Sequence, residues 1–403
     1  MGANHRLRCS ICERVAEPAD WRCSSCAGLL RIEWIEEPPP ERVDLNRAGI
    51  WRYRPLLPDL RSSSIITLGE GSTPLIWLDR WAAAHRLDRV GVKLEYISPT
   101  GSFKDRGMTT MVSRAVALGV NHLVEDSSGN AGASLAAYAG RAGLAATIFV
   151  PFSAPATKRA QIARIGATIV PIDGSRSAVT EAALNRAASD GAYYAGHNAN
   201  PYFASGMATF AYELIEQLWS DLPRHLVIPT GGGSLVVGAF EGFRRWLGDE
   251  ASSQSMIPRF HAVQSTGCAP LVAAFDAGCE HPPSIERQPT IAGGIEVEHP
   301  PRGREILRVL RASQGSAIAV DDDEIRRERQ LLASLEGLDV EPTTAAAFAG
   351  LARLARSGVI RPMEPIVVAA TGAGWKDPGV SVPLWRSSQE YSRHQEGPRI
   401  GHS

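Results

Sequence analysis

The chain has 403 residues, which is enough for two domains of ordinary size and a small additional segment. Apolar residues make up 44% and charged residues 21%, a composition typical of a soluble globular protein that leaves little room for global disorder. The net charge of −1 indicates no nucleic-acid or membrane surface, and no apolar run approaches the roughly 18 residues of a membrane span. The N-terminus has no apolar signal core, so we expect a cytoplasmic protein.

Four of the six cysteines form two C-x-x-C pairs near the N-terminus. They are Cys9, Cys12, Cys23 and Cys26. In a cytosolic protein this pattern favours metal ligation over disulfides, and four thiolates complete a closed tetrahedral site. We therefore predict a structural zinc ribbon over residues 1–35, with redox pairs or a vestige of such a site as the alternatives. Cys268 and Cys279 are isolated and are predicted to be packing residues.

Beyond this segment, residues 36–41 are rich in proline and glutamate and predict a stiff, solvated linker. An aromatic and basic stretch at 50–54 is expected to lie over a domain or to form an interface, and residues 68–75 form a glycine-rich turn that enters a strand. From there strands and helices alternate, which predicts parallel α/β sheets covered on both faces. The expected strands are residues 90–96, 122–125, 146–150, 168–172, 225–229, 260–264 and 365–370. The expected helices are residues 108–118, 131–142, 156–165, 177–189, 203–219, 302–311, 322–335 and 343–356.

Ligands of open α/β sheets bind where strands lead into helices, and four such loops here have unusual composition. The first loop, residues 98–107, places Lys104 at a helix start. A cation there opposes the helix dipole, so the position is unfavourable unless the amine has a task or a compensating anion. A lysine whose ammonium form is disfavoured is a competent nucleophile towards a carbonyl. Considered alone, Lys104 is also compatible with a solvated surface lysine.

The second loop places Ser127, Ser128 and Asn130 beside free backbone amides at a helix start. These donors match a carboxylate or the phenolic oxygen of a planar ring, while a simple N-cap followed by a glycine turn would have the same composition.

The third loop places Gly231, Gly232, Gly233 and Ser234 between a strand and a helix, where the backbone can approach a phosphate closely. It has neither the Walker ending nor the dinucleotide signature, which indicates a cofactor with a single phosphate monoester. The fourth loop presents the Thr371 hydroxyl directly after a strand.

In their order and spacing these loops resemble the threonine synthase branch of the fold-type-II pyridoxal-phosphate enzymes, within the tryptophan synthase beta-like superfamily. Residues 289–295, 341–346 and 68–75 and the N-terminal cysteine segment resemble the same family, so the likeness spans residues 9–378. It implies a two-lobed α/β fold with parallel sheets flanked by helices, an amino-acid substrate and a homodimer. The implied parts are a zinc-ribbon-like segment at 1–35, a linker and lead-in at 36–66, a large cofactor-binding domain at 67–97 and 206–385, a smaller mobile domain at 98–205, and a polar tail at 386–403.

The resemblance also implies roles for individual residues. Lys104 would be the catalytic residue, binding the aldehyde of pyridoxal 5'-phosphate covalently and later moving the α proton of the substrate. Asn130 would bind the ring oxygen, the glycine loop with Ser234 would hold the phosphate, and Thr371 would face the pyridine nitrogen. A hydroxyl does not stabilise a pyridinium, so elimination or replacement at the β or γ carbon is favoured over transamination. The residues expected to bind the substrate are Thr100, Ser127, Ser128 and Asn198.

Two segments depart from the family's pattern. Threonine synthases commonly carry an arginine and a lysine where this chain has Phe203 and Ala208, and the loss of both removes the obvious partners of a substrate phosphate. Glu296, Glu298 and His299 also stand where the family usually has a basic residue and an asparagine. An acidic pair there would repel phosphate.

Three hypotheses follow from these observations. The first is a lyase of the threonine synthase type, with O-phosphohomoserine and water giving threonine and phosphate as the reference reaction. The second is a β-replacement or β-elimination enzyme resembling cysteate synthase or serine/threonine dehydratase, acting on a different substrate. The third is a ribbon-bearing binding module for nucleic acid or partner proteins whose catalytic lobe has decayed. The near-zero net charge and the presence of Lys104, Asn130 and the glycine loop argue against the third.

Overall fold

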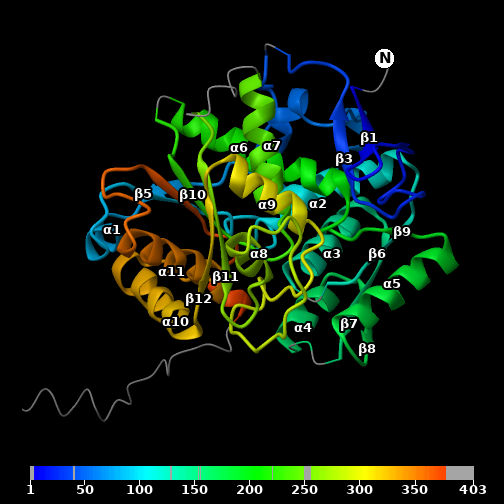
Figure 1. The fold of residues 1–403 in the computed structure, drawn as a ribbon. Helices are drawn as coiled ribbons and strands as arrows, with labels where there is room; N and C mark the ends of the chain where they lie inside the picture. Colours follow the sequence, from blue (N-terminus) through cyan, green and yellow to red (C-terminus); the bar gives the residue numbers. More distant parts are fainter. Residues whose placement is uncertain are drawn as a thin grey trace, which may run out of the picture.

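A small antiparallel sheet opens the chain and lies at one side of the molecule (Figure 1). The structure is a computed structural model that describes residues 4–39, 41–127, 129–152, 154, 156–219, 221–248 and 256–377. The strands of the first sheet, in the order β2-β1-β3, are β1 (His5–Cys9), β2 (Val15–Ala16) and β3 (Leu30–Trp34). Its inner face packs Leu7 and Leu30 against Tyr202, so that this small sheet rests on the main body. The linker that follows has no regular structure over residues 37–39.

A six-stranded sheet forms the larger half of the body, in the order β12-β11-β10-β13-β5-β4. Its strands are β4 (Leu75–Trp77), β5 (Val90–Lys93), β10 (His225–Pro229), β11 (Arg259–Ser265), β12 (Ser316–Val320) and β13 (Ile366–Ala369). All neighbours are parallel except β4, which runs antiparallel to β5. Every residue of β5, β10 and β13 is buried, as expected for parallel strands that are covered on both faces.

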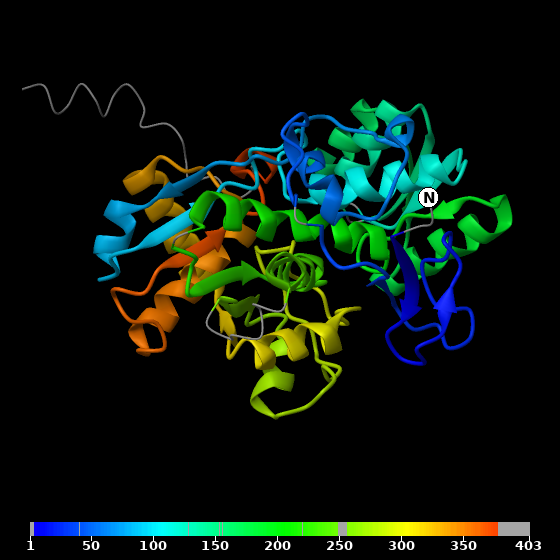
Figure 2. The ribbon, with the colours of Figure 1, turned by 90° about the horizontal axis from the view of Figure 1, so that it is seen from above.

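A four-stranded parallel sheet forms the other half, in the order β8-β7-β6-β9. Its strands are β6 (His122–Glu125), β7 (Ala145–Pro151), β8 (Thr168–Ile172) and β9 (Tyr193–Tyr194). The two sheets lie in separate halves of the molecule in both ribbon views (Figures 1 and 2). The predicted domain boundaries remain a prediction.

The helices flank the two sheets. Their bounds are α1 (Asp79–Ala84), α2 (Lys104–Ala117), α3 (Asn130–Ala142), α4 (Ala156–Arg164), α5 (Arg176–Asp190), α6 (Pro201–Leu218), α7 (Ser234–Leu247), α8 (Pro270–Asp276), α9 (Gly303–Ala312), α10 (Asp322–Leu331) and α11 (Pro342–Arg356). Helices α2 and α6 cross closely at Gly107 because this residue has no side chain. A Cβ there would lie only 2.7 Å from Met207 Cε and from the Phe203 ring. Side chains in this crossing are therefore fixed by packing on both sides.

A buried ion cluster ties α2 and α6 to the six-stranded sheet. The Arg106 guanidinium donates to Glu95 at 2.6 Å and to Glu213 at 2.7 Å, and Lys93 Nζ lies 2.7 Å from Glu213. The four side chains are at most 3% exposed. Two cations and two anions balance, so the cluster is neutral as a whole.

Most predicted elements are confirmed, with ends shifted by a few residues. The aromatic stretch forms a 3-10 helix, Gly49–Leu56, which lies over α6 through a Tyr53–Tyr212 ring contact at 5.5 Å. The helix expected over 322–335 is confirmed, and its last turn is a π-helix at Leu332–Glu336. The strand expected over 90–96 ends at Lys93. Sequence patterning did not reveal β9, β12, α1 or α8. With two, six and seven residues, β9, α1 and α8 are too short for a clear periodic signal.

Cys268 is buried as predicted, whereas Cys279 is exposed, so its interpretation as a packing residue is wrong. It follows the short helix α8 in a solvent-facing turn. The predicted polar tail at 386–403 lies outside the described residues. Within the described ranges no helix has the length and apolarity needed to cross a membrane.

Candidate active site

Lys104 is the first residue of α2 and is half-buried among aromatic rings. Its Nζ lies 4.4 Å from the centre of the Phe103 ring and 5.9 Å from that of Phe203. Burial lowers the pKa of the Lys104 amine to about 8, against the opposing influence of the Glu125 and Glu341 carboxylates. About one tenth of the amine is therefore uncharged at pH 7, and the uncharged form is the nucleophile towards an aldehyde.

Asn130 and Thr371 converge on one carboxylate although they come from different halves of the molecule. Asn130, which begins α3, donates from Nδ2 to Glu341 Oε2 at 3.0 Å. Thr371 follows β13, and its hydroxyl donates to Glu341 Oε1 at 3.4 Å. The Thr371 carbonyl accepts a hydrogen bond from the Phe103 N–H at 3.0 Å, directly before Lys104. The residues expected to bind the ring oxygen and the ring nitrogen are thus connected to the lysine loop.

The glycine loop lies between β10 and α7, with Ser234 as the first helical residue. Gly233 has a φ of 88°, a left-handed conformation that glycine adopts without strain. A Cβ on Gly232 would overlap the Asn198 side chain, and one on Gly231 would lie 2.9 Å from Val297 Cγ2. The loop therefore needs the absence of side chains to fit between its neighbours.

The same loop fits a phosphate group. In the described part of the chain, no hydrogen bond uses the backbone N–H groups of residues 231–234. These amides stand at the N-terminus of α7, where the helix field favours an anion. Donors of this kind, together with Lys104, Asn130 and Thr371, match the phosphate, aldehyde, ring oxygen and ring nitrogen of pyridoxal phosphate.

The predicted substrate-binding residues have different surroundings. Asn198 lies against Gly232, at the glycine loop. The Thr100 hydroxyl donates to Asp105 Oδ1 at 2.7 Å, which fixes the loop before α2. Ser127 is buried, and its Oγ accepts from the Gly129 N–H at 3.4 Å. Ser128 lies outside the described residues. Substrate contacts of all four residues remain predictions.

The two segments that depart from the family's pattern are packed and paired. Phe203 is fully buried in the crossing of α2 with α6, and Ala208 is buried where α6 meets Gly242 of α7. Glu296 and Glu298 each lie 3.3 Å from the Arg287 guanidinium. The charge of the acidic pair is therefore partly neutralised, which the sequence did not reveal. Phe203 and Ala208 present no cation to a substrate phosphate.

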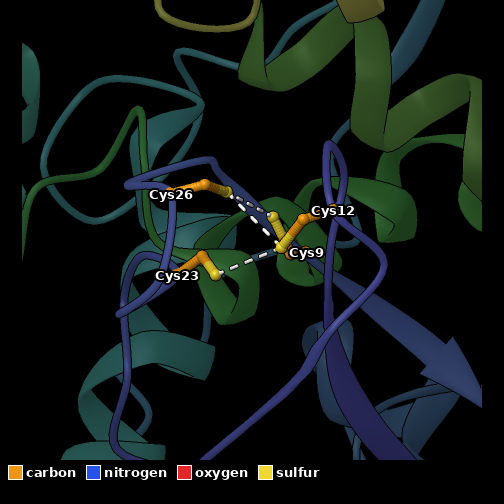
Figure 3. A group of neighbouring side chains, drawn as sticks. All are labelled: Cys9, Cys12, Cys23 and Cys26. Carbon is orange, nitrogen blue, oxygen red and sulfur yellow. Dashed lines mark hydrogen bonds between the residues drawn. The ribbon is translucent and has the colours of Figure 1, made fainter.

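The four N-terminal cysteines gather at one end of the small sheet (Figure 3). Their sulfur atoms all lie within 4.8 Å of one another, with Cys9 and Cys26 separated by 3.4 Å and Cys12 and Cys23 by 3.6 Å. A tetrahedral zinc site with sulfur at about 2.3 Å from the ion separates its ligands by roughly 3.8 Å. The cluster is therefore compatible with one zinc ion.

Comparison with known proteins assigns the family. Residues 66–372 match the family described as "Pyridoxal-phosphate dependent enzyme". The chain belongs to this family. Among its relatives, threonine synthase of Methanosarcina acetivorans is 34% identical over 93% of both chains, and that of Methanocaldococcus jannaschii is 33% identical over 91% of this chain and 90% of its own. The expected enzyme class, a pyridoxal-phosphate-dependent lyase related to threonine synthase, is confirmed.

Solved structures of other enzymes share the fold. Maize serine racemase matches with a TM-score of 0.65 and 23% identity, covering 80% of this chain and 93% of its own. O-ureido-L-serine synthase matches with a TM-score of 0.67 and 21% identity, covering 83% of this chain and all of its own. The predicted α/β fold with parallel sheets flanked by helices is therefore confirmed.

Sequence reasoning assigned no role to three charged or titratable residues beside Lys104. Glu341 stood in a quoted family motif without a function. Glu125 ends an apolar strand immediately before the serine loop, and a carboxylate in that position was the only signal available. His197 lies 72 positions further along the chain, and nothing local to it indicated that it would meet Glu125.

Proposed function

We propose that this protein is a lyase of the threonine synthase type that acts on an amino acid with a leaving group on the β or γ carbon. The reference reaction is the conversion of O-phosphohomoserine and water to threonine and phosphate. The observation that carries the proposal is the convergence of Lys104, Asn130, Thr371 and the glycine loop. The curated threonine synthases that match nearly the whole chain support it.

Each residue has a defined task in this proposal. Lys104 binds the cofactor aldehyde, and its amine then takes the α proton of the substrate. Asn130 holds the ring oxygen, Thr371 faces the ring nitrogen, and the amides of residues 231–234 hold the phosphate. When bound, the cofactor stabilises the negative charge that develops at the α carbon. Thr100, Ser127, Ser128 and Asn198 are proposed to bind the substrate.

A second candidate is a β-replacement or β-elimination enzyme resembling cysteate synthase or serine/threonine dehydratase. The observation that favours it is the burial of Phe203 and Ala208, which stand where an arginine and a lysine are common in threonine synthases. A dianionic phosphate would lack the two charge-assisted hydrogen bonds that those residues supply, and such bonds are among the stronger polar interactions.

A substrate panel tests both candidates. The purified enzyme is loaded with pyridoxal phosphate and offered O-phosphohomoserine, O-phosphoserine, serine and threonine separately, while threonine, keto acid and inorganic phosphate are measured. Threonine from O-phosphohomoserine alone would reject the second candidate, and keto acid from serine or threonine would favour it. In Lys104→Ala the visible absorbance of the covalently bound cofactor should disappear. A wild-type protein that binds no cofactor would overturn the whole proposal.

The ribbon, the quaternary structure and the compartment belong to the same proposal. We propose one structural zinc ion at the cysteine cluster and a cytoplasmic homodimer. Light scattering of the purified protein would measure its mass in solution, and a monomer over the working concentration range would reject the dimer.

A further inference from the structure

A carboxyl–histidine pair beside Lys104 is not used by the proposal above. Glu125 is the last residue of β6 and is fully buried. Its Oε1 lies 2.9 Å from His197 Nδ1, while Oε2 is buried and has no hydrogen-bond partner within the described residues. Burying a carboxyl group with one oxygen unsatisfied is costly, so this oxygen calls for a bound molecule as its partner or for a role in catalysis.

His197 shares one aromatic neighbour with the lysine and precedes a residue that contacts the glycine loop. Its ring packs edge-on against Phe203, with 5.6 Å between ring centres, and the Lys104 amine lies over the same Phe203 ring at 5.9 Å. The next residue, Asn198, is in contact with Gly232. The Nε2 atom makes no hydrogen bond among the described residues, and the side chain keeps 10% of its surface exposed. Nε2 is therefore the ring nitrogen available to a bound molecule.

The surrounding charges determine where the proton of the pair resides. Burial and the neighbouring Asp126 raise the pKa of Glu125 well above its usual range, against the opposing charges of Arg176 and Lys104. Burial, Lys104 and Arg176 lower the pKa of His197 well below its usual range. Both effects favour a protonated Glu125 and a neutral His197. Glu125 then donates to Nδ1, so the tautomer of His197 has its hydrogen on Nε2.

We propose that His197 is the general acid that protonates the departing oxygen of the substrate, and that Glu125 positions and reprotonates His197. The substrate is accordingly an amino acid with a free hydroxyl group on the β or γ carbon. The proposal rests on the proposed function in its general form, a leaving group on the β or γ carbon, and it makes that group a free hydroxyl in place of the phosphate of the reference reaction. A hydroxyl group leaves readily only if it receives a proton, whereas a phosphate ester or a halide leaves without one. The absence of a cation at Phe203 and Ala208 agrees with this substrate class.

For a β-hydroxy substrate the step balances as follows. Lys104 takes the α proton, and the electron pair of that C–H bond forms the double bond between the α and β carbons. The C–O bond breaks, and its electron pair leaves with the oxygen, which takes the proton from His197 Nε2. Nδ1 takes the proton of Glu125, so that water departs and Glu125 is left as a carboxylate.

The test compares substrates whose leaving groups differ in their need for a proton. His197→Gln and Glu125→Gln are assayed with L-serine against β-chloro-L-alanine, and with L-homoserine against O-phospho-L-homoserine. We expect kcat on the hydroxyl substrates to fall by about 10²–10⁴-fold in His197→Gln, the usual contribution of a general acid. On the activated analogues the loss should stay below about tenfold. His122→Gln is the matched control, because His122 begins the same strand and contacts Thr147 instead.

A second measurement is independent of turnover. Infrared spectra of the wild type, taken as the difference from Glu125→Gln, should contain a protonated-carboxyl band, and this band should be shifted in His197→Gln. Absence of this band from the wild type would overturn the shared proton. Equal losses on both members of a substrate pair, or no loss on either, would overturn the leaving-group role alone. A wild type that turns over none of these substrates would overturn the proposed function and the leaving-group role together.

Discussion

Arg106→Met should be among the most destabilising single substitutions in this fold, because it leaves two buried carboxylates with one cation. All three guanidinium nitrogens of Arg106 donate hydrogen bonds. The acceptors are Thr73, Glu95, Thr209 and Glu213. Methionine retains much of the aliphatic volume, so the loss is mainly electrostatic. Breaking a buried ion pair by removing one partner costs about 3–5 kcal/mol, and we expect a loss of that size in the free energy of unfolding.

Urea-induced unfolding followed by circular dichroism measures this loss. Arg89→Met is the matched control: Arg89 pairs with Asp221 at the surface, with side chains 38% and 46% exposed, and such pairs contribute about 0–1 kcal/mol. The double variant Arg106→Met/Glu95→Gln restores a balanced charge and should be less destabilised than the sum of the single variants by at least about 1 kcal/mol. A loss below about 1 kcal/mol in Arg106→Met, or strictly additive losses, would refute the reasoning.

Three other predictions concern the cofactor and the metal. The pKa of Lys104 is lowered to about 8, so the fraction of uncharged amine rises with pH through that value. The rate at which the cofactor-free protein captures pyridoxal phosphate should therefore be half-maximal near pH 8. A rate that still rises steeply above pH 9 would contradict this. Gly232→Ala should weaken cofactor binding at least about tenfold in a fluorescence titration, because its Cβ would overlap the Asn198 side chain. Gly293→Ala is the control and should bind the cofactor normally, because no atom of the described residues other than its chain neighbours lies within 4 Å of its Cβ. Cys9→Ser/Cys12→Ser should lose the zinc that elemental analysis finds in the parent, and equal zinc contents would show that the cluster holds none.

Several features were determined by the sequence alone because they depend on neighbours along the chain. Alternating apolar runs and helical patterns predicted the strands and helices, with β6, β8 and β10 correct at both ends. The spacing of the cysteines predicted a cluster, and the four loops at strand ends indicated the family that the comparisons confirm. Such signals are short-range, because backbone conformation and periodic burial depend on residues within a few helical turns or within one strand.

Only the tertiary structure decided which of these local pieces meet. The sheet order places β13 between β5 and β10, which brings Thr371 to the lysine loop. Asn130 reaches Thr371 through Glu341, a residue 211 positions away, and no local pattern encodes that distance. Likewise, the burial of Phe203 follows from the approach of α2 and α6 at Gly107.

The same distinction applies to the chemistry. The sequence was sufficient to predict a role for Lys104 and to indicate the pyridoxal-phosphate family, because both depend on motifs that are continuous in the chain. The pairing of Glu125 with His197, and with it the proposed substrate class, depends on two strand ends that become neighbours only in the folded sheet, where β6 and β9 are adjacent. The packing of distant segments fixes the distance between the Glu125 and His197 side chains. The loss of solvent that accompanies this packing decides which of the two side chains holds the proton.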